Sequence, residues 1–152
     1  LKGAIIYSAG DTIASILLND FSIYRLLGMM LVGATIYAFE IPNYFMWIDE
    51  KTLFYNKLKK TFVKTGLAIV YFNPFWIFRH LAFIKLFSGN YDQINSNLLL
   101  IAFWSFLANI PIAFLANYLI QNKVKLNFRF LASALFSAIM AIYYALSETI
   151  FL

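Results

Sequence analysis

The sequence predicts an all-α integral membrane protein: a single transmembrane helical bundle over residues 1–152, with four to five membrane-spanning helices. Composition is the first reason, because 62% of the residues are hydrophobic and 12% are charged, whereas a soluble domain is about half apolar and about a quarter charged. A soluble chain this short leaves too much surface in water to bury so many apolar side chains. The second reason is that the apolar residues occur in long runs, and the 20% of aromatic residues suit helices with rings near the lipid–water interfaces.

Five apolar stretches are the candidate helices, and they cover residues 4–18, 26–48, 62–87, 98–120 and 128–152. A transmembrane helix needs about 20 apolar residues, whereas a membrane strand would be about 10 residues long with strict alternation. The last four stretches meet the helical length. The first is short and contains Gly10 and Asp11, so we expect a partial or tilted span. Pro42, Pro74 and Pro111 lie within the next three stretches and should bend their helices.

The basic residues concentrate in two loops, which predicts the topology. The loop over 49–64 holds five lysines and two acids, and the loop over 121–129 holds three basic residues and no acid. With five spans these loops fall on one side, which the positive-inside rule assigns to the cytoplasm or the mitochondrial matrix. The N-terminus is predicted on that side and the C-terminus opposite. Because the excess charge of +5 does not form a basic face on a soluble fold, no nucleic-acid partner is expected.

The fourth stretch has a narrow polar face. Asn109, Ala113 and Asn117 are spaced by four residues, with Ser105 one turn earlier. In lipid, an amide side chain seeks a partner on another helix or water. Hydrogen bonding between helices is the commoner use of such residues, and a polar pore lining is the alternative.

Small residues predict close helix packing in the fifth stretch and in the first two. The fifth has a row spaced by four residues, and the first two have glycines; these are Ser133, Ser137, Ala141 and Ala145, and Gly3, Gly10, Gly28 and Gly33. Small side chains allow two helix backbones to approach each other. The pattern indicates a tight bundle and identifies no substrate.

Asp11 and Glu40 are the carboxylates in the most apolar context. A charge within a membrane is costly and is by default a candidate for function. The structural interpretation, which we favour, pairs each of them with an arginine near a helix end. The candidate arginines are Arg25, Arg79 and Arg129.

The sequence offers no catalytic or cofactor motif. It has no cysteine, which excludes disulfides, thiolate metal sites and cysteine catalysis. The single histidine, His80, is expected near the membrane interface and cannot form a metal site alone. No glycine-rich phosphate loop, paired carboxylates or Glu-His cluster is present. We therefore predict no enzymatic activity, no metal and no cofactor.

A series of short motifs extends over nearly the whole chain. The order is Lys2-Gly3-Ala4, Gly10-Asp11, Arg25, Gly28, Tyr44-Phe45, Ile48-Asp49, Pro111, Asn117-Tyr118, Arg129 and Leu146-Ser147. It resembles the family of small peroxisomal and mitochondrial membrane proteins named for the 22-kDa peroxisomal membrane protein. The chain departs from the family pattern at several positions, with Ser15 for Gln, Ala38-Phe39 for Gly-Pro and Ile110 for Trp. The resemblance implies a compact bundle of about four or five helices in a mitochondrial inner or peroxisomal membrane, with a channel-like role.

Two functions are compatible with these patterns. The first is a non-catalytic accessory subunit of the mitochondrial inner membrane, which packs against a larger membrane complex; the peroxisomal membrane is the second location. Its expected partners are other membrane subunits and lipids, with cardiolipin at the basic loops. The alternative is a small channel for solutes or ions, lined by Asn109, Asn117, Asp11 and Glu40, but a conducting path normally needs a continuous polar lining.

Overall fold

The computed structural model describes the backbone of residues 2–150 and the side chains of residues 3–140, 142 and 143. The described chain is helical with short connections and contains no strand. Seven α-helices and one 3₁₀ turn follow in order: α1 Lys2–Leu17, α2 Ile23–Ala34, α3 Ile36–Lys51, α4 Lys57–Tyr71, α5 Pro74–Phe87, η1 Tyr91–Gln93, α6 Ser96–Lys123 and α7 Leu126–Ile150.

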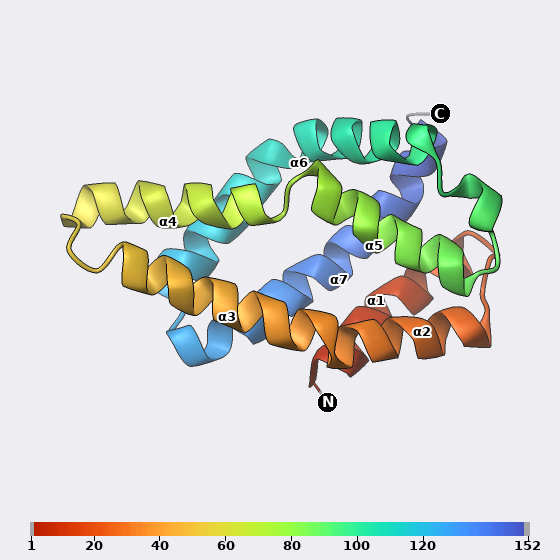
Figure 1. Cartoon of the computed structure of the whole chain (residues 1–152), viewed down its shortest axis with the longest axis horizontal. Coiled ribbons are helices and arrows are strands. Elements are labelled where there is room, and N and C mark those ends of the chain that lie inside the picture. Colours follow the sequence, from red (N-terminus) through yellow and green to blue (C-terminus); the bar gives the residue numbers. More distant parts are fainter. Residues whose placement is uncertain (1, 151–152) are drawn as a thin grey trace.

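The helices form an elongated bundle (Figure 1). The pairs α2–α3 and α4–α5 each run nearly the length of the molecule, whereas α6 and α7 lie obliquely and stop short of the α3–α4 connection. Helix α1 starts part-way along and ends beside the start of α2. Helix α1 packs against α2 and α7, and α6 packs against α4, α5 and α7. The bundle therefore encloses one continuous apolar core, which includes the fully buried side chains of Met29, Tyr37, Phe45, Ile77 and Leu81.

Three stretches of the described chain are long and apolar enough to cross a membrane, as expected of an integral membrane protein. They are Ile23–Lys51, Lys57–Phe87 and Ser96–Lys123, of 29, 31 and 28 residues. Helix α1 has 16 residues and rises about 24 Å, less than the roughly 30 Å of a bilayer core. Leu126–Met140, the part of α7 whose side chains are described without a gap, is also a shorter apolar helix.

The prolines interrupt the helices at fewer places than the sequence suggested. The second stretch breaks at Thr35, whereas Pro42 lies inside the uninterrupted α3. The third stretch breaks where predicted, since Pro74 is the first residue of α5 and the side chain of Asn73 accepts hydrogen bonds from the backbone N–H groups of Phe75 and Trp76 at 2.9 and 3.1 Å. Helix α6 continues through Pro111 and changes direction near its middle.

The glycines allow the close packing that the sequence predicted. A Cβ atom on Gly3 would lie 2.6 Å from the carbonyl oxygen of Gly33, and one on Gly28 would lie 2.1 Å from the ring of Phe87. In the α1–α7 contact, a Cβ on Gly10 would lie 2.6 Å from the Cα of Ala138. The α1 backbone thus lies directly against α2 and α7.

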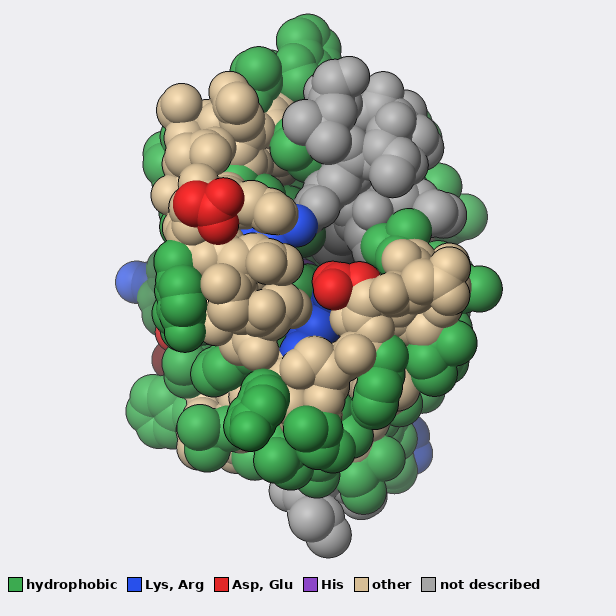
Figure 2. All heavy atoms as spheres, turned by 90° about the vertical axis from the view of Figure 1, so that its right-hand side faces the viewer, with side chains coloured by type: hydrophobic (Ala, Val, Ile, Leu, Met, Phe, Trp, Pro, Cys, Tyr) green, Lys and Arg blue, Asp and Glu red, His purple; other side chains and the backbone are tan. Residues whose placement is uncertain are grey.

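The two ends of the bundle differ in charge. The end that carries the α3–α4 and α6–α7 connections, here called the basic end, brings together the two lysine-rich loops (Figure 1). At the opposite end, here called the neutral end, acidic side chains lie beside basic ones near the centre of the face, with hydrophobic side chains around them (Figure 2). Many large apolar side chains on the outer surface are exposed, including Tyr24, Phe39, Phe62 and Ile139, which suits contact with lipid.

Substitution Gly10→Ala should destabilise the bundle. The new methyl group would overlap the backbone of Ala138, and overpacking typically costs about 1–3 kcal/mol. The control is Gly66→Ala, because a Cβ at Gly66 meets no atom within 4 Å; this variant should be neutral or slightly stabilised. Unfolding in mixed micelles by increasing SDS, followed by circular dichroism, would measure both. Equal stability of the two variants would contradict the assigned α1–α7 contact.

Candidate functional site

Three ion-pair clusters connect the helices at successive positions along the bundle. One lies near the neutral end between α1 and α2, one lies near the middle between α3 and α5, and one lies at the basic end between α3, α4 and α7. Each contains a carboxylate and an arginine. These clusters, together with the polar face of α6, form the candidate site.

Asp11 and Arg25 form the cluster at the neutral end. The Nε and Nη2 atoms of Arg25 donate to the two carboxylate oxygens of Asp11 at 2.9 and 2.7 Å. The Asp11 side chain is 1% exposed. The Nη1 atom of Arg25 donates to the more exposed Asp20 at 2.9 Å. The arrangement binds both oxygens of a buried carboxylate and thereby offsets the cost of burying the charge.

Glu40 and Arg79 form the cluster in the middle, on the outside of the bundle. The guanidinium donates to both oxygens of Glu40 at 3.0 and 2.7 Å, and the Tyr71 hydroxyl donates to the same carboxylate at 3.0 Å. The side chains of Glu40 and Arg79 are 33% and 36% exposed. They line an open groove of about 530 Å³ beside the Asn73-Pro74 break. We call this feature the mid-bundle groove.

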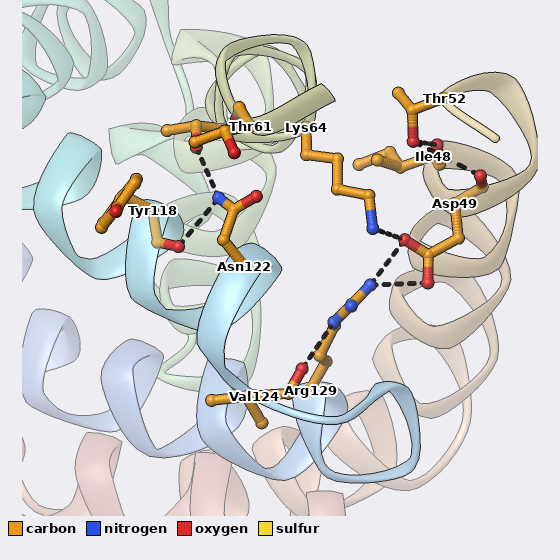
Figure 3. A network of polar contacts seen from close by, with 10 residues as sticks. Ile48, Asp49, Thr52, Thr61, Lys64, Tyr118, Asn122, Val124 and Arg129 are labelled. Carbon is orange, nitrogen blue, oxygen red and sulfur yellow. Dashed lines mark hydrogen bonds and ion pairs between the residues drawn. The ribbon is translucent and has the colours of Figure 1, made fainter. Parts of the chain in front are cut away.

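Asp49 is the centre of the cluster at the basic end (Figure 3). It accepts from the Nη1 atom of Arg129 at 2.8 Å to each oxygen and also pairs with Lys64. Arg129 additionally donates to the carbonyl oxygen of Val124 at 3.0 Å. The sequence placed Asp49 among the loop charges and offered Arg129 as a partner for Asp11 or Glu40. The structure instead pairs Arg129 with Asp49, because α7 starts beside the end of α3.

His80 lies inside the bundle and near the middle of its helix, α5, not at the helix end. It is 2% exposed. Its Nδ1 atom and the Tyr37 hydroxyl are 3.0 Å apart in a hydrogen bond, and its ring stacks on Trp76 with 5.4 Å between centroids. The hydrogen bond satisfies polar groups of two helices in the core. Sequence reasoning missed it because the partners are 43 residues apart.

The polar face of α6 is buried, as is Ser133 of α7. Ser105, Asn109, Asn117 and Ser133 are all buried. The Asn117 amide donates to the Ala113 carbonyl of its own helix at 2.9 Å, and the Asn109 Oδ1 atom has no partner among the described residues. Ser137 accepts from the Tyr7 hydroxyl at 3.5 Å. The side chains of Ala141 and Ala145 lie outside the described residues.

Asn109, Asn117 and Ser137 line a small cavity between α6 and α7. Its volume is about 20 Å³, which is enough for about one water molecule. Phe72, Trp76 and Phe106 close the other walls. In the described part of the bundle these amides therefore face a space for about one water molecule, which is too small for a passage.

The arrangement gives the described residues no obvious metal-binding chemistry. Within this part of the chain, no three His, Asp or Glu side chains lie close enough together to hold a metal ion. The carboxylates that the structure describes in the interior are bound by arginine or lysine. The three ion-pair clusters provide electrostatic attraction between helices.

Comparison with protein-family models, curated proteins and solved structures gives no match for this chain. The resemblance to the family of the 22-kDa peroxisomal membrane protein therefore stays a prediction from the motifs alone.

Asp11→Asn and Asp20→Asn should have different costs, although both residues bind Arg25. Loss of Asp11 leaves the buried Nε and Nη2 side of the guanidinium without a charged partner and should cost about 3–5 kcal/mol, whereas loss of the exposed pair with Asp20 should cost about 1 kcal/mol or less. The double substitution Asp11→Asn/Arg25→Gln should recover part of the loss. Equal SDS midpoints for the two single variants would contradict a structural role for the Asp11–Arg25 pair.

Proposed function

We propose that this protein is a non-catalytic integral membrane protein that packs laterally against a larger membrane complex as an accessory subunit. The observation that carries the proposal is the partly exposed Glu40–Arg79 pair in the mid-bundle groove. Glu40 lies near the middle of the Ile23–Lys51 stretch, and the Asn73-Pro74 break lies near the middle of Lys57–Phe87. The pair thus lies at the depth where lipid solvates charge least.

A neighbouring protein would remove the cost of this exposure. Charged side chains within membranes almost always face a bundle interior or a water-filled cavity, but this pair faces an open groove of about 530 Å³. A helix of another subunit seated in the groove would cover the pair and exclude lipid from it.

The same geometry favours the subunit over the channel. The amides proposed to line a pore, Asn109 and Asn117, face a cavity of about 20 Å³, and Asp11 is bound at both oxygens by Arg25. A conducting path needs a continuous polar lining or a wet cavity. These residues would have to lose their present contacts to form one.

We further propose that α7 makes a fourth crossing, because its backbone helix runs over 25 residues to Ile150, and that α1 is a partial span. The basic end would face the cytoplasm or the mitochondrial matrix. The mitochondrial inner membrane, with the peroxisomal membrane second, is proposed on the motif resemblance.

A photo-cross-linker placed in the mid-bundle groove should reach a neighbouring subunit. The chain has no cysteine, so the substitution Phe75→Cys introduces a single thiol that can be labelled with a thiol-reactive benzophenone. Phe75 is exposed and lines the groove. Ile112→Cys is the control, since it is a comparably exposed position near the middle of α6. Illumination in the native membrane should give a discrete higher-mass product from the groove position and much less from the control.

A second variant separates assembly from folding. Glu40→Gln/Arg79→Gln removes both charges together, so the bundle should keep its helical content while the cross-linked product is lost. Equal cross-linking at both positions, or migration only as a monomer after mild detergent extraction and native electrophoresis, would contradict the subunit proposal. In liposomes, solute or ion flux that is lost on Asn109→Leu and Asn117→Leu would support the channel instead.

Single cysteines in the connections should report the orientation. Phe54 and Lys125 lie in exposed connections of the basic end, and Tyr91 lies at the neutral end. Each is replaced by cysteine in a separate variant: Phe54→Cys, Lys125→Cys and Tyr91→Cys. In sealed vesicles an impermeant maleimide should label the first two from one side and the third from the other. Labelling of Phe54→Cys and Lys125→Cys from opposite sides would contradict the proposed crossing pattern.

A further inference from the structure

A polar pocket of about 270 Å³ opens at the basic end. It lies between the first two turns of α4, the last turns of α6 and the start of α7. The cations that line it are Lys57, Lys60, Lys64, Lys123 and Arg129. We call it the basic pocket.

The pocket carries more positive charge than the protein neutralises. Lys64 and Arg129 share one carboxylate, that of Asp49 (Figure 3). Lys57, Lys60 and Lys123 also line the pocket, and the ion pairs between described residues include no carboxylate for any of the three. Helix α4 begins at Lys57, so the positive end of its dipole adds to the potential. The excess favours an anion with several acceptor oxygens.

Gln121 is an independent sign of a missing ligand. It lines the pocket, yet it is 0% exposed, and neither its Nε2 nor its Oε1 atom has a hydrogen-bond partner among the described residues. A buried amide without partners is costly. The adjacent Asn122 is satisfied, since it donates to the Thr65 hydroxyl at 3.1 Å and to the Tyr118 carbonyl at 3.0 Å. Gln121 thus places an unpartnered buried amide in the lining of the cationic pocket.

The surroundings indicate a lipid as the source of the anion. Lys57 begins α4 and Lys123 ends α6, so the pocket lies where membrane-spanning stretches end and lipid phosphates are found. Leu58, Phe62 and Leu119 lie on the same helical turns, and all three are exposed. They would accommodate acyl chains directly beside a bound headgroup.

We propose that the basic pocket binds the phosphate of an anionic phospholipid headgroup. Lys57, Lys60 and Lys123 supply the charge, Gln121 donates to a phosphate oxygen, and the Asp49 cluster holds Lys64 and Arg129 in place. The inference rests on the proposed membrane embedding but not on any neighbouring subunit. Failure of lipid binding would therefore leave the groove cross-linking test unaffected.

Native mass spectrometry of the whole chain in an uncharged detergent tests the site. The probes are cardiolipin, phosphatidylglycerol, phosphatidylcholine and inorganic phosphate at equal phosphate concentration. Cardiolipin and phosphatidylglycerol should bind at least about tenfold more tightly than phosphatidylcholine or inorganic phosphate. Lys57→Gln/Lys60→Gln/Lys123→Gln should weaken cardiolipin binding at least about tenfold, because each lysine near a membrane surface contributes appreciably to anionic lipid attraction.

The matched control removes the same charge outside the pocket. Lys51, Lys59 and Lys125 are exposed residues of the basic end that do not line the pocket, and Lys51→Gln/Lys59→Gln/Lys125→Gln should change cardiolipin affinity by less than about threefold, as expected of solvent-screened charges. Gln121→Leu should weaken lipid binding and raise the melting temperature of the lipid-free protein, because it removes an unsatisfied amide. Equal losses in the two triple variants, or a Gln121→Leu protein that binds cardiolipin normally, would overturn the site. Inorganic phosphate that binds as tightly as cardiolipin would overturn the lipid as its source.

Discussion

Pairing of the buried charges within the described part of the bundle is the constraint on which the arrangement of helices depends. Lipid cannot solvate an isolated charge, so each carboxylate in a spanning segment needs a cation on another helix. Asp11 with Arg25 sets α1 against α2, Glu40 with Arg79 sets α3 against α5, and Asp49 with Lys64 and Arg129 sets α3 against both α4 and α7. Close packing at Gly3, Gly10 and Gly33 adds steric specificity to these ion pairs.

The features that could be predicted from the sequence are those that depend on composition and local spacing. Hydropathy located the helical stretches, because about 20 apolar residues in a row have few alternatives to a helix in lipid. Glycine positions predicted close backbone contacts, and the structure confirms them at Gly3, Gly10 and Gly33. The lysine-rich loops were expected on one side, and Lys64 and Arg129 do meet at Asp49.

The remaining features depend on contacts between distant segments. Nothing near His80 in the sequence indicates that Tyr37, 43 residues away, would satisfy its ring inside the core. The break at Thr35 also escaped prediction, since proline is the usual signal and Pro42 lies within an intact helix. The unsatisfied amide of Gln121 could not be predicted either, because its lack of a partner depends on how three helices pack together.

The break at Asn73-Pro74 gives the two halves of the α4–α5 segment different polar features. Helix α6 packs against both halves and keeps them in one bundle. The first half supplies Lys57, Lys60 and Lys64 to the basic pocket, which α6 and α7 also line, while the residues around the break supply Tyr71, Phe75 and Arg79 to the mid-bundle groove on the outside. In an unbroken helix, the residues that follow Tyr71 would continue on the same helical faces as the residues of α4. Because the Asn73 cap and Pro74 restart the helix there, a charged end suited to a headgroup and a mid-depth ion pair suited to a protein neighbour can coexist on one segment.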